Sequence, residues 1–418
     1  MGIMNRKETT ERGCGNMKGK KILAGIMAGA MLAGACIGGS MAEWQEETKS
    51  GKVIRRTWIN DEGQSGTAPE GYASVALSYS GTSVTEKYYD AAGQPVAAIG
   101  GYYGRTLTYG NKHRVEEIIY LDAEGKKTES ADGYARVKIV YTSAGGVTVA
   151  TYYDATNTMV VVPKLGYAQV KNDYRGTTLT KTTYYGEDKK EIDTPLGYAV
   201  MIQSVNKSNK VTGIRFEHAD GSAAACRDGW ATMKRELDKK NREVSVKYYD
   251  LGGQMMDLGK GYGYEEKKWE SDRAYTVKRF DLQGQQIAMG EGYTGLRREM
   301  NKAGQVIRET YLDENDAAKE NGEGVATRKY EYDSAGRIVK VSFEGKRGDN
   351  TENSSGYAAY VESLDEDGFL VKRSYYGKNG KGVNICAGYS EIVYKYDENH
   401  ILMEKEYYNV NGELVKTE

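Results

Sequence analysis

A pair made of glycine and an aromatic residue recurs along this sequence at nearly constant spacing. The steps between successive copies are 30, 32, 33, 31, 32, 32, 31, 32, 32 and 32 residues. The copies stand at Gly71-Tyr72, Gly101-Tyr102, Gly133-Tyr134, Gly166-Tyr167, Gly197-Tyr198, Gly229-Trp230, Gly261-Tyr262, Gly292-Tyr293, Gly356-Tyr357 and Gly388-Tyr389, with Gly324-Val325 as an aliphatic copy. A period of this length is typical of repeat architectures, in which each unit buries its apolar surface against its neighbours. The sequence therefore predicts one continuous array.

A second aromatic marker has the same period. It stands at Trp58, Tyr88, Tyr120, Tyr152, Tyr184, Phe216, Tyr248, Phe280, Tyr311, Phe343, Tyr375 and Tyr407. Between the two markers each unit alternates polar and apolar residues, as at Ala135, Val137 and Ile139, which is typical of half-buried strands. A four-residue turn that opens with Asp or Asn and closes with Gly or Asn interrupts the alternation, as in residues 301–304 (NKAG) and 206–209 (NKSN). Each unit is predicted to be a β-hairpin followed by a connection.

The predicted fold is all-β: an elongated array of about eleven hairpin repeats, each of roughly 32 residues, preceded by half a unit. Strand twist accumulates in large open sheets, so we expect a long twisted or superhelical antiparallel sheet. The predicted boundaries are a signal peptide over residues 1–42, a short linker over 43–50 and the array over 51–418. All four prolines lie in connections, where no ladder hydrogen bond is lost: Pro69, Pro95, Pro163 and Pro195.

The N-terminal segment has the pattern of an export signal. Basic residues 18–21 (KGKK) precede an apolar run rich in small residues, and Ser40-Met41-Ala42 offers a cleavage site before Glu43. A second interpretation is lipidation at Cys36, because residues 32–36 (LAGAC) resemble a bacterial lipobox. A retained membrane anchor is a third. We expect cleavage and a secreted or cell-surface protein.

Composition and charge exclude one class of partner. The chain has 35 Tyr but only 4 Phe and 4 Trp, with a mean hydropathy of −0.67, which suits a thin sheet with much of its area near water. Residues 1–42 hold six Lys/Arg and two Glu, which leaves a net charge of −5 on residues 43–418. A mildly acidic array lacks the basic surface of a nucleic-acid binder.

No catalytic constellation stands out, so we expect a protein that is not an enzyme and has no cofactor. The three histidines, His113, His218 and His400, fall in predicted turns far apart in sequence, whereas a general base needs a positioned partner. Acidic turns such as residues 313–316 offer oxygen ligands to calcium, but ordinary turn chemistry accounts for them. Cys226 and Cys386 lie five repeats apart and are predicted to be free thiols.

Two segments resemble known repeats. Residues 330–341 (YEYDSAGRIVKV) and 394–400 (YKYDENH) resemble the YD repeat of Rhs and teneurin-type proteins, which joins a Tyr-Asp pair, a turn glycine and an alternating strand. The 32-residue period and the Gly-Tyr-Ala opening depart from that family. Residues 407–418 (YYNVNGELVKTE) resemble bacterial cell-wall-binding and MORN-like repeats. Both resemblances imply an exported hairpin-repeat architecture.

The candidate binding residues come from adjacent tyrosine pairs at the second marker. Neighbours in a strand point to opposite faces, so one ring packs between repeats while the other faces solvent. The second rings are Tyr89, Tyr153, Tyr185, Tyr249, Tyr376 and Tyr408. A row of exposed rings suits multivalent binding of a cell-wall or cell-surface polysaccharide.

Three alternatives stay open. Both rings of each pair could be structural. The array could be a spacer or a protein-adhesion module, which a charged face without aromatic residues and a free strand edge would favour. It could also be an Rhs-like fragment associated with a toxin system.

Overall fold

The computed structural model describes residues 43–60 and 63–418, so the predicted signal peptide and Cys36 lie outside the described residues. Within the described ranges there are 28 strands in one antiparallel sheet that does not close on itself. The helical content of this part is a single 3-10 turn, η2 (Asn111–His113). The predicted all-β hairpin array is confirmed.

The strands follow one another closely along the chain. The first twelve are β1 (Glu43–Lys49), β2 (Lys52–Ile59), β3 (Ser74–Ser80), β4 (Ser83–Tyr89), β5 (Gly104–Tyr109), β6 (Val115–Leu121), β7 (Arg136–Tyr141), β8 (Val147–Tyr153), β9 (Gln169–Arg175), β10 (Thr178–Tyr185), β11 (Val200–Val205) and β12 (Val211–Glu217). The next eight are β13 (Ala223–Ala224), β14 (Thr232–Leu237), β15 (Glu243–Tyr249), β16 (Met255–Met256), β17 (Tyr264–Ser271), β18 (Ala274–Phe280), β19 (Gln286–Ile287) and β20 (Gly295–Met300). The last eight are β21 (Val306–Leu312), β22 (Thr327–Tyr332), β23 (Ile338–Glu344), β24 (Ala359–Leu364), β25 (Leu370–Tyr376), β26 (Glu391–Tyr396), β27 (Leu402–Tyr408) and β28 (Leu414–Thr417).

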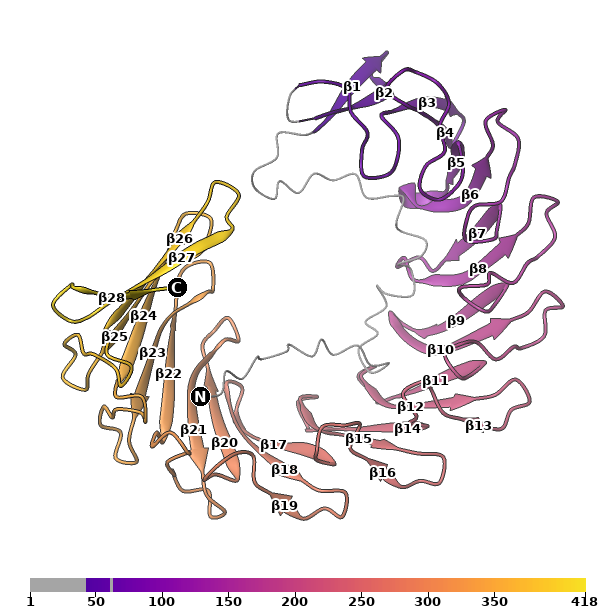
Figure 1. Cartoon of the computed structure of the whole chain (residues 1–418). Coiled ribbons are helices and arrows are strands. Elements are labelled where there is room, and N and C mark those ends of the chain that lie inside the picture. Colours follow the sequence, from indigo (N-terminus) through magenta and orange to yellow (C-terminus); the bar gives the residue numbers. More distant parts are fainter. Residues whose placement is uncertain (1–42, 61–62) are drawn as a thin grey trace. The chain divides into compact units, whose positions relative to one another are not determined.

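The chain forms two compact units. The first runs to Lys234 and includes Tyr249–Gln254, and the second comprises Arg235–Tyr248 and Met255–Glu418. Within each unit consecutive hairpins follow one another in chain order (Figure 1). In the first unit, for example, β7 pairs with β8 as a hairpin, and β8 pairs with β9 of the next repeat.

The predicted turn chemistry is present in the hairpins. The Asn301 carboxamide oxygen accepts hydrogen bonds from the backbone N–H groups of Ala303 and Gln305, at 2.9 and 3.0 Å. Gly304 closes this turn at a φ of 83°. Asn209 and Asn241 close their turns at φ values of 58° and 62°, in the left-handed region that asparagine tolerates. The residue types at these positions therefore follow from backbone conformation.

The connection between repeats contains a turn of its own, after which the chain returns to pair with the strand that it has just left. After Tyr153, the Asp154 carboxylate accepts hydrogen bonds from the N–H groups of Thr156 and Thr158, each at 2.8 Å. The chain then returns to form a bridge between Tyr153 and Met159. The glycine of each Gly-aromatic pair lies at the end of this connection, just before the next strand. At Gly166 φ is 75°, and a Cβ atom would lie 2.2 Å from Cδ of Pro195, so only glycine fits there without a shift of the backbone.

The two aromatic markers form much of the core together, as rows of ring contacts that we call the aromatic ladder. In the first unit the ring centroids lie 4.3 to 6.2 Å apart along Trp58, Trp44, Tyr72, Tyr88, Tyr102, Tyr120, Tyr134, Tyr152, Tyr167, Tyr184, Tyr198, Phe216 and Trp230. In the second unit Phe343, Tyr357, Tyr375, Tyr389 and Tyr407 continue the pattern, with centroids 4.8 to 6.0 Å apart. Tilted and edge-on contacts of this kind stabilise beyond their buried area.

A second set of aromatic residues ties each hairpin to the one before it. These residues stand at the end of the first strand and donate a hydrogen bond of 2.6 to 3.1 Å to a carbonyl 26 or 27 residues earlier: Tyr79, Tyr141, Tyr174, Trp269, Tyr332 and Tyr396. Tyr332 and Tyr396 belong to the Tyr-Asp dipeptides of the sequence. The tyrosine of such a dipeptide therefore joins neighbouring repeats, while its aspartate shapes the turn.

The predicted linker over residues 43–50 is wrong. Residues Glu43–Lys49 form β1, which pairs along its length with β2. Ser50 and Gly51 make the turn at φ values of 52° and 74°, a two-residue hairpin connection instead of the four-residue turn of later repeats. The Trp44 ring lies 5.3 Å from that of Trp58 and begins the ladder. The half-unit expected at the start is thus a complete hairpin.

Because the ladder tyrosines are buried, we expect the protein to unfold at alkaline pH. Desolvation raises the pKa of Tyr134 and of Tyr167 to about 12, and raises the pKa of Tyr152 well above its ordinary value. An unfolded tyrosine titrates near pH 10, so the unfolded chain releases these protons first. The stability is fully present below pH 10 and is lost as the pH rises through about 12, by about 1.4 kcal/mol per pH unit for each such tyrosine.

The measurement is circular dichroism from pH 8 to 13 together with the absorbance of tyrosinate. We expect part of the tyrosinate signal to appear only with loss of the β-sheet signal. Ionisation of every tyrosine near pH 10 in a protein that keeps its sheet would contradict this prediction.

Candidate functional site

The two faces of the sheet differ in what they present. The ladder face carries the aromatic ladder, and the second face carries the neighbouring residue of each strand, because side chains alternate. At the second marker the first ring is core: Tyr88 and Tyr152 are each 2% exposed. The following rings, Tyr89 and Tyr153, are half-buried on the second face. We call the six predicted residues the tyrosine row, and all of them are half-buried: Tyr89, Tyr153, Tyr185, Tyr249, Tyr376 and Tyr408.

In the first unit, cations lie over members of the tyrosine row. The guanidinium of Arg136 lies 5.1 Å from the ring centroid of Tyr153, and that of Arg55 lies 5.4 Å from Tyr89. Arg136 also forms an ion pair with Glu117, which positions it beside the ring. Contacts of this kind are attractive through the ring quadrupole. The rings are therefore held in place by charged side chains on the same face.

Hydroxyl groups surround these rings. Thr85 and Thr106 share a 3.0 Å hydrogen bond across β4 and β5, and the Gln169 amide donates to Thr151 at 2.7 Å across β8 and β9. Threonine and glutamine offer both donors and acceptors beside an aromatic platform, and arginine adds donors. In the first unit the second face is thus a mixture of aromatic, neutral polar and charged groups.

The second unit has a different second face. Ion pairs cross its strands: Glu344 pairs with Arg308 at 2.6 Å and with Lys329 at 3.2 Å, and Lys340 pairs with Glu331 at 2.7 Å. The Tyr408 hydroxyl donates to Glu406 at 2.7 Å, so this member of the row belongs to the charged pattern. The exposed Lys340–Glu331 pair contributes about 0–1 kcal/mol to stability. This face is mainly charged.

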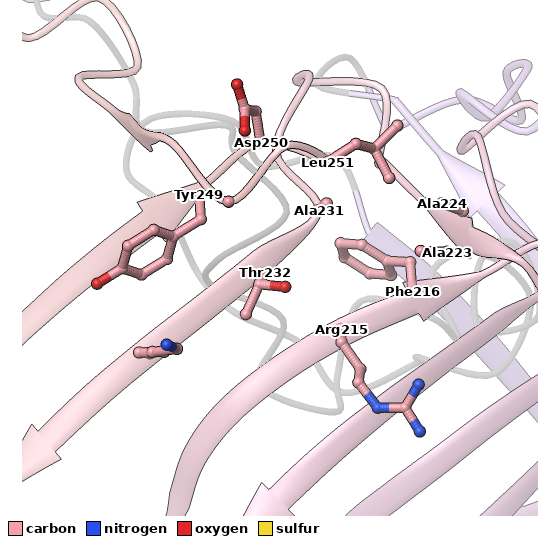
Figure 2. Close-up of a pocket in the computed structure, with 11 residues that line it drawn as sticks. Arg215, Phe216, Ala223, Ala224, Ala231, Thr232, Tyr249, Asp250 and Leu251 are labelled. Atoms are coloured by element: carbon pink, nitrogen blue, oxygen red, sulfur yellow. The ribbon is translucent and has the colours of Figure 1, made fainter.

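A cavity of about 250 Å³ opens beside Tyr249 in the first unit. Figure 2 shows the Tyr249 ring and the Arg215 side chain on either side of Thr232, with Asp250 and Leu251 in the turn above them. Lys234 also lines the cavity, and its amine lies 4.9 Å from the ring centroid of Tyr249. Of these lining residues, sequence reasoning identified Tyr249 alone. Residues 223–225 (AAA), a run of small side chains in one connection, were a signal that could have pointed to this repeat.

The histidines and cysteines lie where the sequence placed them. His113 is in η2, His218 begins a turn, and His400 is in a turn at a φ of 58°. His218 contacts the Asp193 carboxylate at 2.9 Å. Cys226 and Cys386 are free thiols, as predicted, the first buried and the second exposed.

In residues 43–60 and 63–418 no group of His, Cys, Asp and Glu side chains is arranged to hold a metal ion. The same part of the chain contains no helix that is long and apolar enough to cross a membrane.

No protein-family model matches this chain, and no curated protein matches it. Among solved structures, a chain of the TcdB2-TccC3-TEV crystal structure aligns with a TM-score of 0.22 and 11% identity, over 90% of this chain and 24% of that one. A chain of the Tc holotoxin pore of Photorhabdus luminescens aligns with a TM-score of 0.18 and 12% identity, over 85% and 21%. A porin-like protein from Bacteroides uniformis aligns with a TM-score of 0.19 and 8% identity, over 79% and 90%.

This chain thus spans about a quarter of the length of the TcdB2-TccC3 chain, since 24% of that chain is covered. At these TM-scores the three likenesses carry no argument about function.

Proposed function

We propose that this protein is a non-catalytic, exported repeat protein that binds polysaccharide at the cell surface or in the envelope through its tyrosine row. One observation carries the proposal. In five of the six Tyr-Tyr pairs, such as Tyr152-Tyr153, the first ring is buried in the ladder and the second lies half-buried on the opposite face, whereas in Tyr248-Tyr249 both rings are half-buried. The second ring is thus the one that a ligand can reach.

The chemistry of the first unit fits a sugar chain. Sugar rings stack on aromatic faces through their C–H groups, and their hydroxyls need donors and acceptors nearby. Tyr153 and Tyr185 provide platforms on β8 and β10, and the Thr151–Gln169 pair lies between them. Two strand spacings and a register offset of two residues separate Tyr153 from Tyr185 by roughly 12 Å, which is on the scale of a disaccharide of an extended chain. Weak contacts repeated in this way gain strength by multivalency.

The second unit favours a second candidate function. Its cross-strand ion pairs, such as Lys372 with Glu391 at 3.3 Å, make a charged surface with few exposed rings. Charged faces of this type suit a structural spacer or a module that adheres to another protein. We keep this role as the alternative for the second unit.

The proposal includes kinship with YD repeats. Tyr332 and Asp333 have distinct roles, since the tyrosine hydroxyl bonds to Val306 and the aspartate accepts the N–H of Arg337. Association with a toxin system, as an Rhs-like fragment, is the third candidate.

The test is a pull-down of the protein on purified insoluble cell-wall polysaccharides. We expect retention of the wild type, and about 100-fold weaker binding by a variant carrying Tyr89→Ser, Tyr153→Ser and Tyr185→Ser, at about 1 kcal/mol per ring. The matched control changes charged residues of the second face in the second unit: Glu331→Ser, Lys340→Ser and Lys372→Ser. Circular dichroism shows whether each variant is folded.

Two results would contradict the proposed function. One is a wild type that none of the polysaccharides retains, which favours the spacer or adhesion role. The other is a folded tyrosine variant that binds as well as the wild type, which leaves the rings with a structural role only.

A further inference from the structure

The cavity beside Tyr249 is lined by small side chains at a place where several other repeats of the first unit have larger ones. Ala223 pairs with Glu217 at the start of its connection. The residues that make the equivalent pairing in four other repeats of the first unit are larger: Pro95, Lys127, Met159 and Glu191. Ala223 is exposed, so its small size leaves open space on the second face.

The same region collects positive charge. Arg215 and Lys234 line the cavity, and Asp250 is the one acidic residue among its lining side chains. Arg215 is bonded to Glu217, with 54% of its side chain exposed. Lys234 forms no salt bridge within residues 43–60 and 63–418, and its amine stays close to the Tyr249 ring. An anionic group that enters the cavity would therefore meet an ammonium without a carboxylate partner.

The geometry also limits the size and kind of ligand. Register pairing places Arg215 opposite Thr232 on β12 and β14, and the backbone N–H of Ala231 donates to the carbonyl of Tyr249 at 2.7 Å. The guanidinium, the hydroxyl and the aromatic ring thus lie on neighbouring strands (Figure 2). A volume of about 250 Å³ is below the roughly 300–1,000 Å³ of pockets that hold drug-sized molecules. It suits one sugar ring.

We propose that this cavity binds an acidic sugar residue, a pyranose that carries a carboxylate, within a polysaccharide. The inference rests on the proposed function and adds the class of sugar. Tyr249 stacks on the C–H face of the pyranose. Lys234 and Arg215 donate charge-assisted hydrogen bonds to its carboxylate, which are stronger than bonds between neutral groups. Thr232 and Asp250 bond to its hydroxyls.

The test compares two matched ligands, trigalacturonate and its methyl ester, by isothermal titration calorimetry on the whole protein. The ester keeps the sugar and removes the charge. We expect the acid to bind about 10- to 100-fold more tightly than the ester, as the loss of one or two charge-assisted bonds implies.

Two variants and one control locate the site. Lys234→Gln is expected to lower the preference for the acid about tenfold or more. Ala223→Met is expected to weaken both ligands because methionine fills the cavity, and Met159 shows that the fold accepts this side chain at the equivalent place. Lys340→Gln is the control, because it removes a cation from the second face of the second unit, outside the tyrosine row of the first unit, and is expected to leave the preference unchanged.

The outcomes separate this inference from the proposed function. Equal binding of acid and ester, or a Lys340→Gln effect as large as that of Lys234→Gln, overturns the acidic-sugar site. Retention of the wild type on insoluble polysaccharide that depends on Tyr89, Tyr153 and Tyr185 but not on Ala223 or Lys234 also overturns it, while the proposed function stands. Absence of binding to any polysaccharide overturns both.

Discussion

Replacing Tyr152 by alanine is expected to lower the free energy of unfolding by about 3–5 kcal/mol. The Tyr152 ring is 2% exposed, and its centroid lies 4.9 Å from that of Tyr134 and 6.0 Å from that of Tyr167. Truncation removes both contacts and leaves a void inside a single-layer sheet. In an array, each repeat is stabilised mainly by its neighbours, so the loss affects the repeats on both sides.

The adjacent residue provides the control for this prediction. Tyr153→Ala removes a ring of the same size that is half-buried on the second face, and it is expected to cost about 1 kcal/mol. Tyr152→Phe keeps the ring and is also expected to cost about 1 kcal/mol, since Phe216 fills a marker position at 3% exposure. Urea unfolding followed by circular dichroism measures all three. A Tyr152→Ala variant no less stable than Tyr153→Ala would mean that the ladder is not the core.

Removal of the Glu86 carboxylate is expected to cost about 3–5 kcal/mol, because it separates a buried ion pair. Oε2 of Glu86 lies 2.6 Å from Nε of Arg105, and the two side chains are only 13% and 10% exposed. The Tyr88 hydroxyl also donates to this carboxylate, at 2.8 Å. Glu86→Ala therefore leaves the charge of Arg105 and the hydroxyl of Tyr88 in the core without the acceptor that both now use.

The array itself supplies the control for the ion pair. In the next repeat Ile118 and Val137 occupy the places of Glu86 and Arg105. The double variant Glu86→Ile, Arg105→Val is therefore expected to be within about 1–2 kcal/mol of the wild type, since apolar pairs often replace buried ion pairs at little cost. Chemical denaturation of the single and double variants forms a double-mutant cycle. A double variant as unstable as Glu86→Ala would refute this account.

Several features of the fold could be predicted because they depend on neighbours in sequence. The turn residues at Asn301 and Gly304 follow from the conformation of four consecutive residues. The N-terminal hairpin was not predicted. Residues 43–50 lack the Gly-aromatic marker, and their turn at Ser50-Gly51 has two residues where most later repeats have four. The 32-residue pattern identifies repeats that carry both markers and a four-residue turn, and the first hairpin has neither the glycine marker nor that turn.

Some residues of the candidate site could be predicted from the sequence and others could not. The members of the tyrosine row follow from alternation along a strand, which is a local rule. Arg215, Thr232 and Lys234 do not, because they reach Tyr249 across strands and through the small side chain of Ala223. Nothing in the local sequence indicates that a basic residue of one strand lies beside the ring of another.

The sequence by itself determined the repeat length, the hairpins, the turn residues and the all-β class, because each depends on periodicity and on local backbone preferences. The tertiary structure alone decided which carbonyl Tyr332 binds, that Glu86 lies against Arg105, and that Lys234 lies beside the Tyr249 ring. These contacts join residues about 15 to 26 positions apart, and strand register sets them. Register results from packing the whole ladder, and that packing exists only once neighbouring repeats have come together.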